Sequence, residues 1–180
     1  MFAVCGLYPR HRPVENVTLP DTPFVPDAAP RAFRAALGRF ATGVTVVTTQ
    51  TPDGPIGFTA NSFASVSLDP PLVLWSPARA SSRFAVFAQA AFYTIHVLGA
   101  AQATLSARFL RGGEGFAGLA VDLSPEGMPI LPGVLARFDC AQHATHDGGD
   151  HLIVVGRVLR ATMRDGAPLV FSQGEYGGFA

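Results

Sequence analysis

The sequence contains no lysine: all 13 of its basic residues are arginines. A P-loop, a Schiff-base lysine and pyridoxal phosphate chemistry each require a lysine amine, so these three kinds of site are excluded. Any cation of this chain that meets a phosphate group must therefore be an arginine.

Charged residues of either sign are also scarce. They make up 14% of the 180 residues, against 48% hydrophobic residues, and the formal net charge is zero. Scarce charge leaves apolar surface to be covered, which favours a homodimer. A net charge of zero argues against nucleic acid or an anionic membrane as the partner, so we expect small-molecule ligands.

Cysteine is nearly absent as well. Cys5 and Cys140 are far apart and form no CxxC motif, which argues against a disulfide framework and indicates reduced thiols in the cytoplasm. The first residues, MFAVCGLYPRHRP, do not follow the charged-then-apolar pattern of a signal peptide.

One long stretch without charge, Phe84–Ala107, could be mistaken for a membrane helix. Polar residues such as Gln89, His96 and Gln102 interrupt it along its whole length, and Gly99 lies within it. We expect this stretch to divide into helix, strand and helix.

The pattern along the chain predicts one domain with an N-terminal extension. Residues 1–29 are rich in proline and lack periodicity, so we expect an extended or disordered segment there and a single domain over residues 30–180. Phe33, Leu37 and Phe40 recur at helical spacing and predict a packing helix.

The rest of the domain reads as mainly β, with only short helices, one of them after Ser82 and one over Ala101–Phe109. Many antiparallel strands with few helices indicate a closed barrel. The expected strands are Val44–Gln50, Ile56–Thr59, Leu72–Ser76, Phe92–Leu98, Val134–Thr145, His151–Thr162 and Leu169–Phe171.

The stretch Gly57–Pro77 combines features of a ligand site. Small polar residues come first, a Pro70-Pro71 break follows, and the apolar run Leu72–Trp75 comes next. Hydroxyl groups and backbone amides beside an apolar wall suit a ligand with a flat aromatic body and a phosphate tail. Ser81 and Ser82, at the start of a predicted helix, could cap that helix, bind an anion, or do both.

The same stretch resembles the flavin reductase-like, FMN-binding split-barrel family, which includes the reductase components of two-component flavin monooxygenases. The resemblance is carried by NSFASVSLDPPLVLWSP from Asn61, SSRF from Ser81 and GDHLIVVGRV from Gly149. It implies a six-stranded antiparallel Greek-key split barrel and a homodimer. It also implies reduction of FMN or FAD by NADH or NADPH, through hydride transfer to flavin N5, and supply of reduced flavin to a monooxygenase partner.

Positions in the site follow from the resemblance too. The residues that would contact the flavin ring and its ribityl chain are Thr59, Asn61, Ser62 and Phe63, and Ala60 belongs to the same cofactor-binding stretch. The other expected cofactor-binding residues are Ser81, Ser82 and Arg83 near the phosphate, together with Arg108 and Tyr176.

Two histidines have special places in the resemblance. His96 stands in FYTIHVL where the family commonly has Asn, so we expect it to alter the polar contacts of the flavin. His151, in GDH, would lie beside the face of the flavin ring and place the nicotinamide, which makes it the candidate catalytic residue. In a simpler alternative, His151 closes a hairpin by bonding to Asp150 or to the backbone.

Two other functions stay open. The first is a non-catalytic flavin or haem binder on the same barrel. The second is a metal site, because potential ligands crowd one segment, although their spacing matches no common metal motif and strand alternation sends Cys140 and His143 to opposite faces. These potential ligands are Cys140, His143, His146, Asp147, Asp150 and His151.

Overall fold

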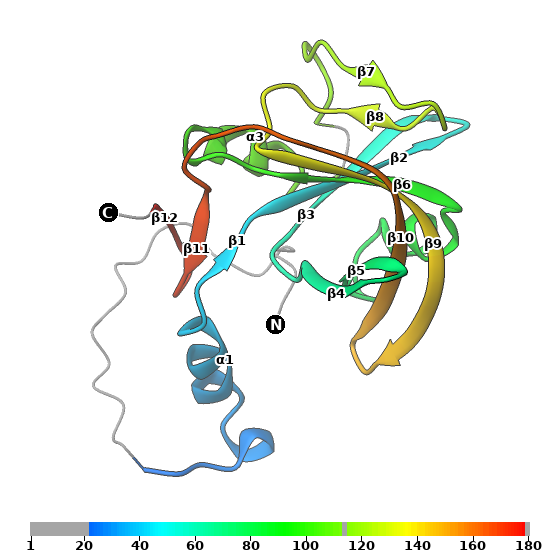
Figure 1. The fold of residues 1–180 in the computed structure, drawn as a ribbon. Helices are drawn as coiled ribbons and strands as arrows, with labels where there is room; N and C mark the ends of the chain where they lie inside the picture. The colour runs from blue at the N-terminus through cyan, green and yellow to red at the C-terminus, as the bar shows by residue number, and fades with distance from the viewer. Residues whose placement is uncertain (1–21, 113–114, 179–180) are drawn as a thin grey trace.

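A computed structural model describes residues 22–112 and 115–178. Most of the regular secondary structure of the described residues is β-strand in antiparallel sheets, with a few short helices (Figure 1), which confirms the mainly β prediction. Cys5 and most of the predicted extension over residues 1–29 lie outside the described residues.

The main sheet has seven strands in the order β3-β2-β6-β9-β10-β5-β4. Its edge strands β3 and β4 do not pair with each other in the described part of the chain. The bounds are β2 (Thr45–Thr51), β3 (Gly54–Ala60), β4 (Ala64–Leu68), β5 (Pro71–Trp75), β6 (Phe92–Val97), β9 (Ala136–Gly148) and β10 (His151–Met163).

The expected count of six strands is therefore wrong for this sheet. The additional strand is β4, whose sequence ASVSL reads as a polar ligand segment rather than a strand. It forms because β5 offers it a partner directly after the turn at residues 69–70, with Leu68 facing Pro71 and Ala64 facing Leu74. Tertiary pairing thus overrides a weak local β-propensity.

Small elements complete the fold. β1 (Thr42–Gly43), β11 (Val170–Ser172) and β12 (Glu175–Gly177) form a second sheet, and β7 (Asp122–Leu123) pairs with β8 (Pro129–Ile130). The helical segments are η1 (Pro26–Ala28), α1 (Pro30–Gly38), α2 (Phe84–Gln89), η2 (Ala100–Gln102) and α3 (Ala103–Arg108). The uncharged stretch Phe84–Ala107 is thus helix, strand and helix as expected, and no described helix is long and apolar enough to cross a membrane.

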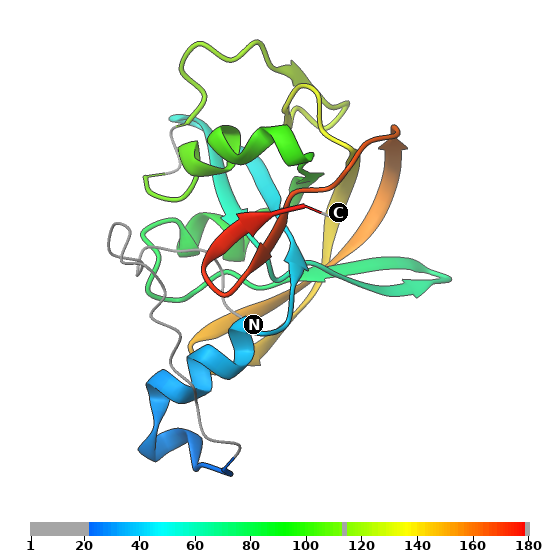
Figure 2. The same cartoon turned by 90° about the vertical axis from the view of Figure 1, so that its left-hand side faces the viewer.

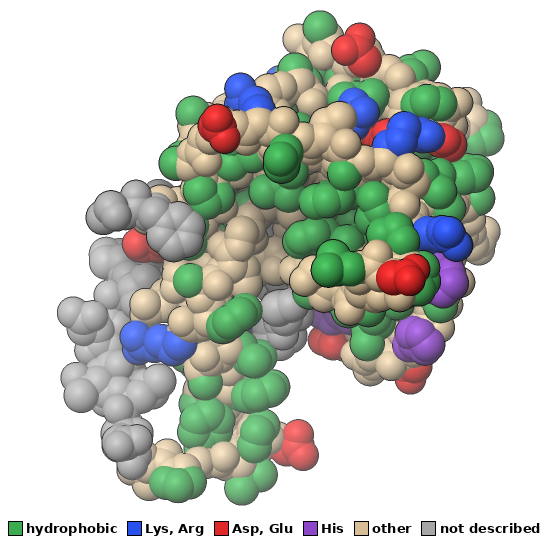
Figure 3. Space-filling view, in the orientation of Figure 1, with side chains coloured by type: hydrophobic (Ala, Val, Ile, Leu, Met, Phe, Trp, Pro, Cys, Tyr) green, Lys and Arg blue, Asp and Glu red, His purple; other side chains and the backbone are tan. Residues whose placement is uncertain are grey.

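Two elements project from the body and expose apolar side chains. α1 projects from the sheets (Figure 1), and apolar side chains lie at its surface (Figure 3). It has no buried residue, and Phe33 on it and Phe40 after it are exposed. The β4–β5 hairpin extends away from the sheet (Figure 2), with Leu68 97% exposed near its turn. The predicted packing helix therefore exists, but none of its residues is buried against the rest of the described chain.

The core lies inside the curved main sheet. Trp75 makes edge-to-face contacts with the rings of Phe58 and Phe87, with ring centroids 5.6 and 5.2 Å apart. A second cluster includes Phe109, which lies against the backbone of Gly57. A Cβ at position 57 would be 2.4 Å from Phe109 Cδ1, so only glycine allows β3 and the end of α3 to approach this closely.

Candidate functional site

The segments that carry the family resemblance lie next to one another in the structure. Ser62 Oγ accepts a hydrogen bond from the Ser76 backbone N–H at 2.9 Å, which joins the β3–β4 corner to the end of β5. Beyond β5, the Leu152 N–H donates to the Pro77 carbonyl at 3.1 Å, and Ala78 forms a β-bridge with His151. Residues 76–83, here called the connector, therefore lie between the β3–β4 corner and the β9–β10 turn.

Arg83, expected at the phosphate, is a structural residue at the end of the connector. Its side chain donates to three backbone carbonyls: Gly57 at 3.0 Å, Phe109 at 2.7 Å and Leu110 at 3.0 Å. The guanidinium lies over the ring of Phe58, 4.2 Å from its centroid, and Arg83 is only 3% exposed. The guanidinium thus joins β3 to the end of α3 from inside the protein, and its contact with a phosphate stays a prediction.

Three residues expected to touch the flavin are also interior. The hydroxyl of Thr59 donates to the Ser106 carbonyl at 2.7 Å, and Thr59 and Ala60 are fully buried. Ser62 is buried, and its hydroxyl accepts a hydrogen bond from the Ser76 N–H and donates one to the Ser76 carbonyl. The side chains of Thr59, Ala60 and Ser62 therefore face the interior, and contact of these residues with flavin stays a prediction.

Asn61 and Phe63 are the members of this group that remain partly accessible. Asn61 Oδ1 is buried and has no hydrogen-bond partner among the residues that the structure describes. The ring of Phe63 stacks on Phe138, with centroids 5.5 Å apart and planes 19° apart. An acceptor without a partner beside an aromatic wall fits a flat ligand that carries N–H or O–H donors.

The connector presents one exposed hydroxyl. Ser82 is exposed, whereas Ser81 is buried and its Oγ accepts a hydrogen bond from the Arg83 backbone N–H at 3.3 Å. Neither serine caps α2, whose N-cap is Arg83 and has no side-chain cap. Ser82 is thus the expected phosphate residue that keeps its hydroxyl at the surface.

Tyr176 and Arg108 make their contacts at the C-terminal half of α3 and the loop that follows it. The Tyr176 hydroxyl is 2.8 Å from Ser106 Oγ, and the Ser106 carbonyl in turn accepts the bond from Thr59. Arg108 donates to the Ala117 carbonyl. Tyr176 therefore connects to β3 through Ser106, whereas Arg108 holds the loop that follows α3.

His96 is a buried neutral histidine in β6. Its Nδ1 is 3.0 Å from the Val46 carbonyl, and its Nε2 accepts a hydrogen bond from the Leu131 N–H at 3.1 Å. The carbonyl requires a proton on Nδ1 and the Leu131 N–H requires a lone pair on Nε2, so the partners fix one neutral tautomer. Burial, with a smaller contribution from the charge of Arg137, lowers the pKa of His96 to about 4 against the raising effect of the Val46 hydrogen bond. Both ring nitrogens thus bond to backbone groups, and an effect of His96 on the polar contacts of the flavin stays a prediction.

His151 begins β10 at the mouth of the site. Its Nδ1 lies 2.7 Å from Asp150 Oδ1, and its side chain is 11% exposed. This is the contact that the hairpin-closing alternative requires, and it also fixes the orientation of the ring. The placing of nicotinamide by His151 stays a prediction.

One ion pair at the site has no local signal in the sequence. Arg79, on the connector, donates from Nη2 to Asp147 Oδ1 at 2.7 Å and from Nε to the Gly149 carbonyl at 3.0 Å. The partners are nearly 70 residues apart in sequence. Only the pairing of the connector with β10 brings them together.

The metal alternative gains no support from the geometry. Within residues 22–112 and 115–178, no group of three His, Cys, Asp or Glu side chains could hold a metal ion. His143 and His146 are exposed on β9, whereas Cys140 is buried. Burial raises the pKa of Cys140 to about 12, so its thiol stays protonated and is neither a metal ligand nor a nucleophile at neutral pH.

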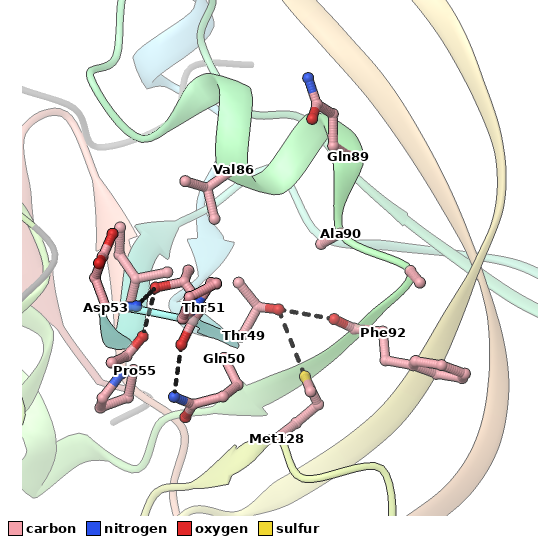
Figure 4. Close-up of a pocket in the computed structure, with 14 residues that line it drawn as sticks. Thr49, Gln50, Thr51, Asp53, Pro55, Val86, Gln89, Ala90, Phe92 and Met128 are labelled. Atoms are coloured by element: carbon pink, nitrogen blue, oxygen red, sulfur yellow. Dashed lines mark hydrogen bonds between the residues drawn. The ribbon is translucent and has the colours of Figure 1, made fainter.

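A cavity of about 660 Å³ opens beyond the C-terminal half of α2 (Figure 4). The β2–β3 hairpin, Val86, Phe92 and Met128 line it, and none of the expected site residues does. Its buried hydroxyl, on Thr49, donates to the Phe92 carbonyl at 2.9 Å and contacts Met128. This cavity is therefore separate from the site built by the connector.

Comparison with known proteins identifies the family of this chain. The family model described as "Flavin reductase like domain" matches residues 37–180. The chain belongs to the flavin reductase-like family.

Relatives of this flavin reductase-like chain match it over most of its length. It is 58% identical to "FMN reductase (NADH) SmoA" of Agrobacterium fabrum, over 93% of this chain and 97% of that protein. It is 44% identical to the "Flavin-dependent monooxygenase, reductase subunit HsaB" of Rhodococcus jostii, over 83% and 77% of the two chains.

Solved structures of flavin reductases share the fold. The NADH:FAD oxidoreductase SgcE6 of Streptomyces globisporus, in complex with NAD and FAD fragments, superposes with a TM-score of 0.82 at 34% identity, over 88% of this chain and 98% of that one. The nitrilotriacetate monooxygenase component B homologue from Mycobacterium thermoresistibile gives 0.81 at 41% identity, over 87% and 89%.

Proposed function

We propose that this protein is an NAD(P)H:flavin oxidoreductase that transfers a hydride from NADH or NADPH to FMN or FAD. The observation that carries the proposal is the meeting of Asn61–Phe63, the connector and His151 in a chain that is 58% identical to an FMN reductase (NADH). Nicotinamide and flavin supply the redox chemistry, so the protein has to bind, orient and shield them.

The residues present fit a flavin. The buried Asn61 Oδ1, which has no partner in the described part of the chain, is available to an N–H of the ring or a hydroxyl of the ribityl chain, and the stacked Phe63 ring offers apolar contact. The exposed hydroxyl of Ser82 is placed to donate to a phosphate oxygen. His151, oriented by Asp150, would place the nicotinamide carboxamide by one hydrogen bond.

Four further features complete the proposal. The order β6-β9-β10-β5 is a Greek-key order, which supports a split barrel. Exposed apolar residues on α1 and the β4–β5 hairpin support a homodimer. Relatives named as reductase components support a monooxygenase partner that receives reduced flavin. The free Cys140 thiol supports a cytoplasmic location. The proline-rich composition of residues 1–29 supports an extension that precedes the domain.

The first test is turnover by the purified protein. We expect it to oxidise NADH or NADPH when FMN or FAD is added, measured by loss of absorbance at the nicotinamide band without oxygen. Flavin binding without turnover by either nicotinamide would contradict the proposal and favour the non-catalytic binder. Haem binding without flavin binding would favour the haem alternative.

Replacing His151 tests the assignment of the nicotinamide. We expect His151→Ala to lower kcat/KM for NADH roughly five- to thirtyfold, the loss of about 1–2 kcal/mol for one hydrogen bond. FMN affinity and Tm should stay close to wild type, and the exposed His143→Ala serves as the matched control. If Tm falls while NADH kinetics are unchanged, His151 only closes the hairpin.

A further inference from the structure

We propose that Arg79 is a positioning residue that fixes the β9–β10 turn, and with it His151, relative to the connector. The inference rests on the proposed function, because it assigns the way in which the nicotinamide side of the site is held. Its evidence is a set of contacts from one side chain to one turn.

Arg79 contacts three residues at the β9–β10 turn. Its side chain bonds to the Asp147 carboxylate at 2.7 Å and to the Gly149 carbonyl at 3.0 Å, and its backbone N–H donates to the Asp150 carbonyl at 2.9 Å. The hydrogen bond from Arg79 lowers the pKa of Asp147, so this carboxylate stays ionised at neutral pH. The turn between β9 and β10 is therefore held from the connector side.

The same turn sets the ring of His151. Asp150 directly precedes His151, and its carboxylate accepts the hydrogen bond from His151 Nδ1 at 2.7 Å. Ala78, next to Arg79, forms the β-bridge with His151. A shift of the turn would move the carboxylate that orients the imidazole.

Arg79 also belongs to the flavin side of the site. It lies in the connector two residues before Ser81, and its guanidinium carbon is 5.4 Å from the centroid of the Phe84 ring. One side chain thus joins the segment proposed to meet the phosphate to the turn proposed to place the nicotinamide.

The exposure of the pair indicates positioning rather than stability. The Arg79 and Asp147 side chains are 42% and 80% exposed. Such exposed ion pairs contribute little to folding, whereas a small displacement of a group beside the reacting atoms can cost orders of magnitude in rate.

The experiment compares Arg79→Met, Arg79→Lys and Asp147→Asn with the wild type, with the exposed Arg157→Met on β10 as control. Met keeps an unbranched apolar stem beside Phe84 and removes the side-chain donors, whereas Lys keeps the charge and loses the Nε donor. The measurements are kcat/KM for NADH at saturating FMN, the FMN Kd, Tm, and hydrogen exchange of the amides of residues 148–152.

We expect Arg79→Met to lower kcat/KM for NADH about tenfold and to speed exchange in the turn, while the FMN Kd changes less than about twofold. Asp147→Asn should act in the same direction, Arg79→Lys should recover part of the loss, and Arg157→Met should match the wild type.

The outcomes separate this inference from the proposed function. A wild type without NADH turnover overturns the proposed function. Turnover that is unchanged in Arg79→Met, with or without faster exchange, overturns only the positioning role. A fall in FMN affinity by the same factor as kcat/KM makes Arg79 a flavin contact and also overturns it.

Discussion

Arg83→Met should destabilise the protein by about 3–5 kcal/mol, because it leaves the buried carbonyls of Gly57, Phe109 and Leu110 without their charged donor. For a chain of this size the loss corresponds to a Tm roughly 10 °C lower. Urea unfolding followed by tryptophan fluorescence measures the effect, since Trp75 lies in the adjacent core.

The exposed Arg157→Met is the matched control, and we expect its unfolding to stay within about 0.5 kcal/mol of wild type. At temperatures where Arg83→Met is folded, its affinities for FMN and riboflavin should change by similar factors. A variant with wild-type Tm and weaker binding of FMN alone would contradict the structural role and restore Arg83 as a phosphate contact.

Acidification should destabilise the protein through His96. Burial lowers its folded-state pKa to about 4, while the unfolded chain takes up the proton near 6.5. The stability that the neutral ring contributes is present above pH 6.5 and is lost as pH falls toward 4. Over this interval the free energy of unfolding falls by roughly 3 kcal/mol, because the unfolded chain binds about one proton more than the folded protein.

The cause lies in the partners of the ring. A proton on Nε2 would point at the N–H of Leu131 and break that hydrogen bond. Urea unfolding at a series of pH values measures how the free energy of unfolding depends on pH. His96→Gln should lower the number of protons taken up on unfolding by about one, whatever its effect on stability at pH 7. The exposed His143→Gln is the control, and an unchanged proton uptake in His96→Gln would show that His96 titrates normally.

Much of the β-structure could be predicted from the sequence because its signals are local. The β-branched run at Val44–Gln50 and the glycine-rich turn before His151 each specify their own conformation. The mainly β class followed from these signals and from the resemblance. β4 did not, because its polar residues become a strand only beside β5.

The roles of individual side chains were harder to predict. Arg83 and Ser82 are neighbours, yet the arginine is buried against β3 and the serine is exposed. Sequence reasoning assigned both to phosphate because it shows residue type and spacing but not direction. The Arg79–Asp147 ion pair could not be predicted from the sequence for a related reason, since its partners meet only through long-range strand pairing.

The connector is fixed at two arginines, Arg79 on the β9–β10 turn and Arg83 on the carbonyls of β3 and α3. Only Ala80, Ser81 and Ser82 lie between them. The length of this segment is therefore more constrained than its composition: exchange of the exposed Ala80 leaves both arginines in place, whereas one inserted or deleted residue separates one of them from its partners. Among related chains, insertions should accumulate elsewhere in the loops, and this interval should keep its length.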